Sequence, residues 1–452
     1  MRLQDAAAAG APRWHRSRSL CGPQSGASIG NGHLDAHRDS RGLVGWPSWL
    51  PAEAEAFGAA TLCLVITAGG DPIYLDYNAT TPVDPRVADA MLPYLTGCYG
   101  NPSSSHRLGR QARQALDHAR SQVASCLGCD PDEVVLTSGG SEANNAAIRG
   151  VVAARGGGHV ICSAVEHPAV LEVVLALECE GRIELSIVGV DQWGRVDPDE
   201  VVGSLRPDTV LVTIMLANNE VGTVQPVAEL AARCRERGVL LHTDAAQAVG
   251  KIPVAVGRLG IDLLSVAGHK LYAPKGVGAL YVRRGVAVEP LIRGAGHERG
   301  RRAGTESLLM AVGLGAACAI VRAELADETE RLTGLRDRLE SRLRAGVPGL
   351  AVHGHPTERL PNTLSVALPG AHAHRLLERL GDRVAASPGS ACHADKVQVS
   401  HVLSAMGVEP ALALSTIRLS VGRFTTGGEV DGAAELILAE VAGTRAGAGF
   451  QR

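Results

Sequence analysis

The sequence predicts an α/β protein, in which a mostly parallel sheet is followed by a smaller C-terminal α/β domain. From Ile73 onward, short apolar runs alternate with helical stretches, which is the order of strand–helix–strand units. The runs are apolar throughout, as in strands that are covered on both faces. With 452 residues, of which 45% are hydrophobic, the chain has room for roughly two or three domains of about 150 residues each.

The apolar runs and the stretches between them define the expected elements of the sheet. Strands are expected at Val134–Thr137, Val160–Ala164, Leu185–Val190, Val210–Leu216, Val239–Thr243, Leu263–Ala267 and Ala279–Val282. Helices are expected at Glu142–Arg155, Val170–Glu180 and Val227–Arg237. The strand ends near Ser138, Asn218, Asp244 and Gly268 should then meet at one edge, where parallel sheets bind ligands.

The C-terminal part is expected to begin with a long charged helix at Arg322–Arg344. A strand at Leu364–Leu368, a helix near His374–Leu380, a loop around Cys392 and a strand at Ile417–Val421 follow. The predicted organisation is a large domain at 73–321, a small domain at 322–445 and a tail at 446–452. The first residues of the large domain are expected to be able to pack with the small one.

Residues 1–72 are rich in Ala, Gly, Ser and Arg and show no sustained periodicity. They are predicted to be a disordered extension or a misassigned start. Arg13, Arg16 and Arg18 lie among serines, so targeting to an organelle stays open, although the acidic residues argue against such a peptide. The expected location is cytoplasmic.

Charge, hydropathy and cysteine spacing exclude several classes of function. The net charge of −3 gives no electrostatic reason to expect nucleic acid. The longest uncharged apolar runs, Phe57–Gly70 and Leu308–Val321, are shorter than the roughly 18 residues that a membrane span needs. Cys126 and Cys129 form a C-x-x-C with no second pair, so no metal site is expected.

Lysine is rare in this chain, since only four of the 44 basic residues are lysine. One of them, Lys270, follows the predicted strand in the segment Ser265–Lys270, directly after Gly268 and His269. A lysine at a sheet edge is usually solvated surface. Because this chain uses arginine wherever any positive charge suffices, Lys270 is a candidate for the one role that arginine cannot fill, a nucleophilic amine.

Three other strand ends carry what pyridoxal phosphate would require. Thr137–Glu142 runs through glycines into a helix, whose N-terminus suits a phosphate. Asp244 ends a strand, where a carboxylate can keep a pyridine nitrogen protonated, although a helix N-cap is an equal interpretation. Asn218–Glu220 places amides that can reach a phenolic oxygen, or that form an Asx turn.

These motifs stand among several that occur in the same order in one family. They are Tyr74–Pro82, Thr137–Asn144, Glu166–His167, Asn218–Gly222, His242–Gln247, Gly268–Lys270, Gly296–Thr305, Ser390–Cys392 and Ile417–Arg423. From about Ile73 to Val441 the chain resembles the cysteine desulfurase and selenocysteine lyase family of pyridoxal-phosphate enzymes. The resemblance implies fold type I, the aspartate aminotransferase-like fold, as a homodimer with pyridoxal 5'-phosphate.

The resemblance also implies a role for each matching residue. Lys270 would hold the cofactor aldehyde and move protons, and His167 would stack on the pyridine ring. Asp244 would pair with the ring nitrogen. The remaining cofactor contacts would come from Gln247 and Asn219 near the phenolic oxygen, from Gly140, Ser141 and His269 at the phosphate, and from Thr305 of the second subunit.

Substrate and sulfur chemistry are assigned by the same resemblance to two further residues. Arg418 would bind the substrate carboxylate through its guanidinium fork. Cys392 would act as a thiolate that takes sulfur from L-cysteine as a persulfide and leaves alanine, after Lys270 has removed the α-proton. A sulfur-acceptor protein, either a scaffold or a carrier, and a role in sulfur metabolism and iron–sulfur cluster assembly are implied. An isolated cysteine is otherwise most often a small buried hydrophobe.

Two departures from the family pattern keep alternatives open. Many desulfurases have a serine where Ala267 stands, so one phosphate contact is absent. Cys392 is followed by His393–Asp395, where desulfurases often have small hydroxyl residues, and the run Ala391–His393 looks more like selenocysteine lyases, which would release selenide from L-selenocysteine. The segment between Cys392 and Gly407 has room for a mobile loop. An aminotransferase, a non-catalytic sulfur-transfer scaffold and a dehydrogenase were the other candidates; the last lacks a G-x-G-x-x-G after its first strand.

Overall fold

The computed structural model describes residues 71–393 and 396–448, without the side chains of residues 390–398 and 444–448. The described residues belong to one compact unit that begins at Asp71. The predicted extension therefore lies almost entirely outside the described residues, as does the end of the predicted tail. The division of the chain into domains stays a prediction.

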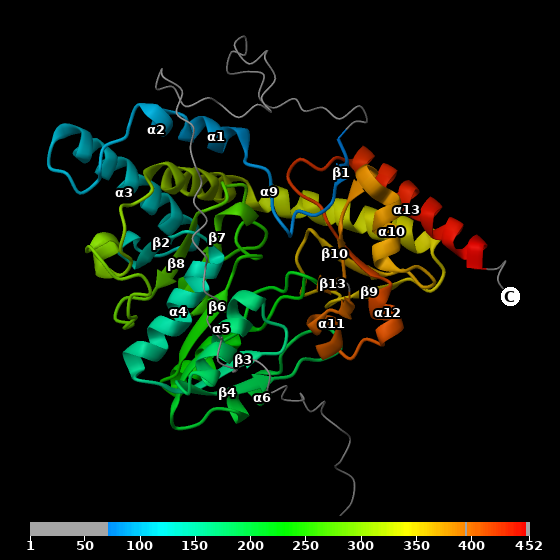
Figure 1. The fold of residues 1–452 in the computed structure, drawn as a ribbon, viewed down its shortest axis with the longest axis horizontal. Helices are drawn as coiled ribbons and strands as arrows, with labels where there is room; N and C mark the ends of the chain where they lie inside the picture. Colours follow the sequence, from blue (N-terminus) through cyan, green and yellow to red (C-terminus); the bar gives the residue numbers. More distant parts are fainter. Residues whose placement is uncertain (1–70, 394–395, 449–452) are drawn as a thin grey trace, which may run out of the picture. The chain divides into compact units, whose positions relative to one another are not determined.

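The centre of the molecule is a seven-stranded sheet in the order β2-β8-β7-β6-β5-β3-β4 (Figure 1). Its strands are β2 (Val134–Thr137), β3 (Gly158–Ser163), β4 (Ile183–Val188), β5 (Thr209–Thr213), β6 (Leu240–Asp244), β7 (Leu263–Ala267) and β8 (Gly278–Val282). All seven predicted strands are confirmed. The sheet is mostly parallel, as expected, and β8 alone runs antiparallel to both of its neighbours, β2 and β7.

Helices cover both faces of this sheet because successive strand side chains point to opposite sides. Val135 and Leu263 pack under α4 (Gly140–Arg155) and α5 (Pro168–Cys179). Their chain neighbours Val134 and Leu264 pack on the other face, with α3 (Arg107–Leu127) and α7 (Val227–Glu236). The three predicted helices of this region are therefore confirmed. Strands β2 and β7 are buried along their whole length because both faces are covered, whereas the edge strand β4 exposes Glu184.

The C-terminal part has a second, four-stranded sheet in the order β12-β15-β10-β9. Its strands are β9 (Ala351–His353), β10 (Thr363–Ala367), β12 (Ser387–Pro388) and β15 (Thr416–Ser420). They pack with α10 (Ala373–Leu380) and α13 (Gly427–Ala448) around a separate apolar core. The first strand of the described chain, β1 (Ile73–Tyr74), pairs in parallel with β11 (Val384–Ala385), and Leu75 lies in the same core.

Helix α9 (Leu308–Gly346) joins the two cores and is longer than predicted. Leu314 and Val321 pack in the core beside the large sheet, whereas Leu339 and Leu343 pack in the C-terminal core. The apolar run that precedes residue 322 is the buried half of the same helix. By length and composition α9 could cross a membrane, but Leu314, Ala317 and Val321 of its apolar half pack in the core beside the large sheet, as in the core helix of a globular protein.

The remaining described elements are short and lie between the longer helices and the strands. They are α1 (Pro85–Met91), α2 (Pro93–Thr96), α6 (Pro198–Gly203), α8 (Val256–Leu259), α11 (His401–Ala405) and α12 (Pro410–Leu414), with 3₁₀ turns η2 (Pro131–Glu133), η3 (Gly268–Lys270), η4 (His297–Gly300) and η5 (Gly381–Arg383). Three proline-led helices, α1, α6 and α12, begin after an acidic N-cap residue whose carboxylate accepts a backbone N–H.

The prediction of a loop around Cys392 is wrong, because the backbone there forms a strand. Residues Ser390–His393 form β13, which pairs in an antiparallel manner with β14 (Lys396–Val399). His393 and Lys396 are the last pair of the ladder, so only residues 394–395 connect the strands. Helix α11 begins two residues after β14, so the segment up to Gly407, which was predicted to have room for a mobile loop, contains a hairpin and a helix. Its mobility stays a prediction.

Candidate active site

A cavity of about 410 Å³ lies at the carboxyl edge of the large sheet, where the loops after its strands meet the C-terminal part. Nine of the predicted site residues line it: Gly140, Ser141, His167, Asn219, Asp244, Gln247, His269, Lys270 and Arg418. They come from the ends of different strands and from β15, as expected for parallel strands that end at one edge. The structure thus brings together residues that lie far apart in the chain.

Lys270 enters this cavity from η3, directly after β7. Its Nζ donates to the backbone oxygens of Asn78 and, at 2.8 Å, of Ala79. Burial, followed by the positive charge of Arg418, lowers the pKa of Lys270 to about 8. A lysine with that pKa is partly neutral near neutral pH, and the neutral amine is the form that attacks an aldehyde.

Asp244 ends β6 and is almost fully buried at the cavity wall. Its Oδ2 accepts from Nδ2 of Asn144 at 2.7 Å, and its Oδ1 accepts from the backbone N–H of Ala246 at 2.9 Å. The residues after it form turns and no α-helix, so the N-cap interpretation does not hold. The buried Oδ1 of Asn144 has no partner within the described residues, so this corner presents acceptors toward the cavity.

The N-terminus of α4 forms the opposite wall. Gly139 has φ +153° and ψ −178°, a conformation open essentially to glycine alone. No side chain caps the helix, so its first N–H groups are available to an anion. A Cβ on Gly140 would lie 3.1 Å from the Cβ of Ala267, so the alanine at the predicted departure packs closely against this turn.

His167 stands at the mouth of the cavity as the N-cap of α5. Its Nδ1 accepts from the backbone N–H of Ala169 at 3.1 Å, so the proton of the neutral ring lies on Nε2. Loss of hydration lowers the pKa of His167, although Asp244 acts in the opposite direction. A neutral, flat ring above the cavity fits the predicted stacking role.

Arg418 projects from β15 into the cavity and is held by three acceptors. Its Nη2 donates to Oδ1 of Asp76 at 2.7 Å and to Oγ of Ser387 at 2.9 Å. Its Nη1 donates to the backbone oxygen of Asn219 at 3.0 Å. The buried Nε has no partner within the described residues, so the guanidinium is oriented and still has hydrogen-bonding capacity.

The Asx turn, which was the alternative interpretation of Asn218–Glu220, is present and is formed by the side chain of Asn218. Its Oδ1 accepts from the backbone N–H groups of Glu220 at 2.8 Å and of Val221 at 3.0 Å. Asn219 is therefore left to line the cavity, where its backbone oxygen also accepts from Nδ2 of Asn78 at 3.2 Å. The Asx turn is thus confirmed for Asn218, and the contact of Asn219 with the phenolic oxygen stays a prediction.

Several lining residues were not singled out from the sequence. Asn78 and Asn144 lie within motifs that carried the resemblance, but they were given no role. Met215 and Ala217 come from the segment after β5. Lys251, a buried neighbour of this site, contacts Asn78 and Gln247. The rarity of lysine was the one signal in the sequence that could have indicated it.

The other two predicted residues are Thr305, which does not line the cavity, and Cys392. Thr305 is exposed beyond η4, in a segment that Arg120 holds through a buried, two-pronged ion pair with Glu298 at 2.6 and 2.7 Å. Its predicted role in a second subunit is a contact that a single chain does not test. Cys392 lies on β13, and its side chain is outside the described residues.

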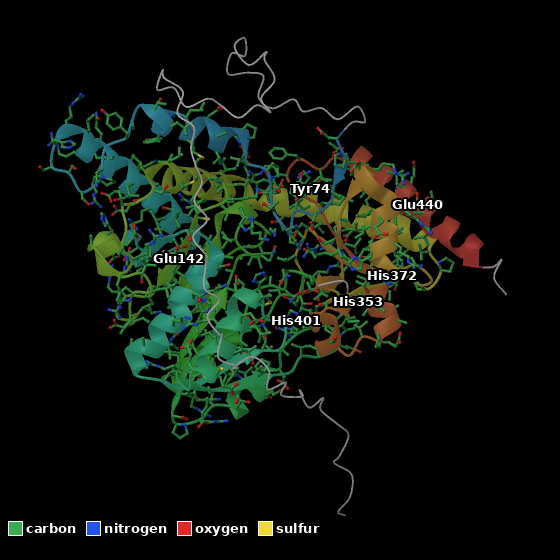
Figure 2. All side chains as sticks on the ribbon, viewed as in Figure 1. Tyr74, Glu142, His353, His372, His401 and Glu440 are labelled. Atoms are coloured by element: carbon green, nitrogen blue, oxygen red, sulfur yellow. The ribbon has the colours of Figure 1, made fainter. Side chains whose placement is uncertain are left out.

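The C-terminal end of the Cys392 hairpin is fixed close to the cavity. Ser400 donates from Oγ to Oε2 of Glu220 at 2.5 Å. His401, labelled in Figure 2, donates from Nε2 to the backbone oxygen of Glu166 at 2.9 Å. Because Glu166 precedes His167 and Glu220 follows Asn219, the hairpin is tied to two of the loops that form the site.

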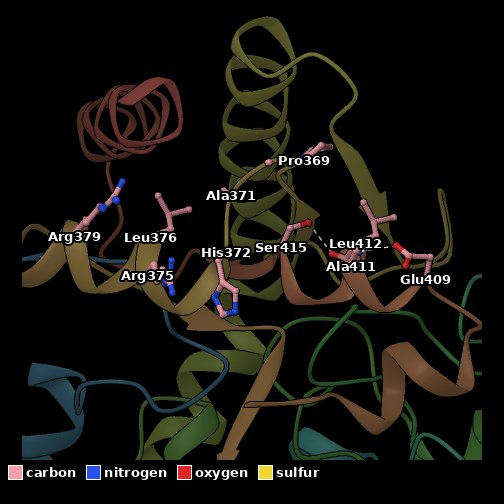
Figure 3. Close-up of a pocket in the computed structure, with 11 residues that line it drawn as sticks. Pro369, Ala371, His372, Arg375, Leu376, Arg379, Glu409, Ala411, Leu412 and Ser415 are labelled. Carbon is pink, nitrogen blue, oxygen red and sulfur yellow. Dashed lines mark hydrogen bonds between the residues drawn. The ribbon is translucent and has the colours of Figure 1, made fainter. Parts of the chain in front are cut away.

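A second cavity, of about 510 Å³, lies between α10 and α12 (Figure 3). Its lining includes His372, Arg375, Glu409 and Ser415 and contains none of the predicted site residues. Within the described residues, no group of three or more His, Cys, Asp or Glu side chains is arranged to hold a metal ion. The titratable groups that converge from several strand ends are those of the first cavity.

Comparison with known proteins decides the family. The family model described as Aminotransferase class-V matches residues 73–432. The chain belongs to the class V aminotransferase family. This family uses pyridoxal 5'-phosphate in the fold type I architecture, and the mixed α/β structure with its mostly parallel central sheet agrees with it.

The class V relatives include curated proteins and solved structures. "Cysteine desulfurase" of Trichormus azollae is 47% identical over 367 residues, which cover 81% of this chain and 92% of that protein. "Cysteine desulfurase IscS" of Escherichia coli O139:H28 (strain E24377A / ETEC) is 46% identical over 373 residues, with the same coverage. A solved "NifS-like protein" has a TM-score of 0.77 at 36% identity, covering 82% of this chain and 99% of that one.

The cavity fits pyridoxal 5'-phosphate. The open N–H groups of α4 and the ring of His269 suit the phosphate, and the carboxylate of Asp244 suits the protonated ring nitrogen. Lys270 supplies an amine with a lowered pKa on the same cavity wall. Each part of the cofactor thus has a chemically matched group in this class V chain.

Proposed function

We propose that this chain is a pyridoxal-phosphate-dependent cysteine desulfurase, which converts L-cysteine to L-alanine and transfers the sulfur to Cys392. The observation that carries the proposal is the meeting of Lys270, Asp244 and Arg418 in one cavity. These three residues meet in a class V chain that is 46–47% identical to proteins named cysteine desulfurase. These relatives favour sulfur over selenium as the element released.

The residues of the chain divide the work by their positions. When bound, the cofactor supplies an electron sink for the electron pair left at the substrate carbon. Arg418, oriented by Asp76, binds the substrate carboxylate beside Lys270. Lys270, with a pKa of about 8, accepts the α-proton and returns a proton to the product.

Sulfur leaves through Cys392. Its thiolate attacks the substrate sulfur, a sulfur–sulfur bond forms, and the carbon–sulfur bond breaks with its electron pair going to the carbon side. That carbon takes up a proton and alanine results, so the balance closes without an external oxidant or reductant. The persulfide on Cys392 then passes its sulfur to an acceptor thiol. The proposal therefore includes a sulfur-acceptor protein that carries this thiol.

The experiment that tests the function measures alanine release from L-cysteine and from L-selenocysteine side by side. Alanine formed from L-cysteine, with persulfide sulfur on the protein, is the expected result. Release of alanine from L-selenocysteine alone would favour the lyase. Transfer of the amino group to a keto acid without release of sulfur would favour an aminotransferase, for which Cys392 has no use.

The homodimer and the cytoplasmic location belong to the same proposal. If Thr305 completes the phosphate site of a second subunit, inactive Lys270→Ala chains mixed with inactive Thr305→Ala chains should regain activity, because one site of the mixed dimer carries neither lesion. A protein that is monomeric by sedimentation and retains full activity would contradict this. Cell fractionation with the complete chain tests the location.

A further inference from the structure

Lys251 is a buried lysine to which the proposed reaction gives no role. Only 5% of its surface is exposed, in the turn segment between β6 and α8. Its Nζ donates to Oε1 of Gln247 at 2.5 Å and to Oδ1 of Asn78 at 3.2 Å. Burial of an amine is costly unless its hydrogens are paired, so these two contacts define what the side chain does in the fold.

The contact with Gln247 sets the direction of an amide. Burial, followed by the charges of Lys270 and Arg418, lowers the pKa of Lys251 well below its usual range. The direction of the amide therefore rests on the contact itself, in which Nζ donates to Oε1. Gln247 turns its Oε1 toward Lys251, and its Nε2 points the other way. One Nε2 hydrogen is donated to the backbone oxygen of Asn78 at 2.9 Å. The second has no partner among the described residues, and Gln247 lines the cavity.

The contact with Asn78 fixes a second amide in the same way. Oδ1 of Asn78 accepts from Lys251 and, at 3.0 Å, from Nδ2 of Asn362. Nδ2 of Asn78 is thereby directed to Oγ1 of Thr363 at 2.8 Å. The backbone oxygen of this same Asn78 accepts from Lys270. Lys251 thus contacts Asn78, whose backbone oxygen accepts from the amine of Lys270. It also contacts Gln247, whose amide is predicted to face the phenolic oxygen.

We propose that Lys251 is a positioning residue, which holds the Gln247 amide with its NH₂ group toward the cavity so that the phenolic oxygen of the cofactor meets a donor. Without it the amide is free to turn its carbonyl oxygen to the same place. The inference rests on the proposed cofactor chemistry and deepens it. It assigns a function to a buried lysine that does not itself touch substrate or cofactor.

The test uses the pH dependence of the visible absorption of the full-length protein with cofactor bound. A donor to the phenolic oxygen stabilises its deprotonated form, so the midpoint of the titration lies lower when the donor is present. Lys251→Met and Gln247→Leu should each raise the midpoint, by about one pH unit or more for loss of a hydrogen bond to a charged oxygen. Lys275→Met is the matched control, since Lys275 is exposed, and should leave it unchanged.

The double variant separates positioning from a simple effect of charge. If Lys251 acts through Gln247, Lys251→Met should add nothing in a Gln247→Leu background. A full additional shift there would show that the charge of Lys251 acts directly, and it would overturn the proposal, as would a wild-type midpoint in Lys251→Met. Lys251→Arg, which also donates only, should restore the wild-type midpoint.

A second substitution covers failure of the methionine variant to fold. Lys251→Leu fills the space with an apolar side chain that cannot donate to Gln247, so it should raise the midpoint as well, and an unchanged midpoint would contradict the proposal. The titration needs bound cofactor but no turnover. A protein that shows these shifts and releases no alanine from L-cysteine would contradict the desulfurase function and leave the role of Lys251 intact.

Discussion

Arg418 and Asp76 form an ion pair across 342 positions of the chain, with 2.7 Å between Nη2 and Oδ1. Their side chains are 11% and 19% exposed, so the pair is largely protected from solvent. The guanidinium is therefore oriented before any substrate arrives. This lowers the entropy lost on binding a carboxylate, because less side-chain freedom remains to be removed.

The first prediction concerns this pair. Arg418→Lys keeps the charge but loses the planar fork, so KM for L-cysteine should rise about tenfold or more while cofactor binding is kept. Steady-state kinetics and the visible absorption of the bound cofactor measure the two effects. Arg383→Lys, an exposed arginine of the C-terminal part, is the control. Unchanged kcat/KM in Arg418→Lys would contradict the assignment of Arg418 to the substrate carboxylate.

The second prediction concerns the reactivity of Lys270. Because its pKa is about 8, attachment of pyridoxal phosphate to the cofactor-free protein should accelerate more than about tenfold from pH 6 to pH 8 and level off above. Borohydride trapping followed by peptide mapping should place the label on Lys270. A rate that still climbs at pH 10, or a label on Lys251 or Lys275, would contradict the assignment.

The third prediction separates cofactor chemistry from sulfur removal. Cys392→Ala should bind cofactor and L-cysteine, with the corresponding change of visible absorption, and its alanine release should fall at least about 100-fold. Cys98→Ala replaces a free cysteine away from the site and should remain active. If Cys392→Ala keeps its full activity on L-cysteine, the proposed mechanism is wrong, and the aminotransferase becomes the favoured alternative function.

The fourth prediction concerns Glu166, which is fully buried beside His167. Its Oε1 accepts from Oγ of Ser163 and from the backbone N–H of Met215, whereas Oε2 has no partner within the described residues. Burial raises the pKa of Glu166 from 4.5 to about 8. Between these values the folded chain binds more protons than the unfolded chain, so the free energy of unfolding falls as pH rises through this window.

Glu166→Gln removes that dependence, since the amide does not ionise. The difference in free energy of unfolding between variant and wild type should change by about 2 kcal/mol or more, in favour of the variant, from about pH 5 to about pH 8. Urea unfolding at both pH values measures it. Glu172→Gln, an exposed position on α5, should show no such change. Parallel pH profiles of Glu166→Gln and wild type would refute the raised pKa.

The strands of the large sheet could be predicted because their signal is local. β2 and β7 begin and end where the apolar runs do, since a strand covered on both faces must be apolar throughout. The start of α9 was missed because its buried half has no charged face, and periodicity is visible only where one side is polar. The β13–β14 hairpin was missed because Gly and Ser before Cys392 indicate a loop, whereas the pairing depends on a partner strand.

The site residues followed from order and spacing, but their contacts did not. That Asp244 and Lys270 end neighbouring strands is implied by the α/β order. That Asn78 supplies the oxygen for Lys270, 192 positions away, depends on tertiary packing, which no local pattern records. The roles of Thr305 and Cys392 depend on a second chain and on a side chain outside the described residues, so they stay predictions.

The pairing of the first strand with late segments has a consequence for synthesis of the chain on the ribosome. Leu75 donates its N–H to Ala385, and its carbonyl accepts from Ser420, so the backbone pairing of the segment that leads to Asp76 is completed only when β15 has been translated. The large sheet can form earlier, because its strands are all contained between Val134 and Val282. A nascent chain that stops before Thr416 would therefore hold a folded sheet that carries the predicted cofactor contacts and lacks Arg418, so the site for the substrate carboxylate would be completed only after the site for the cofactor.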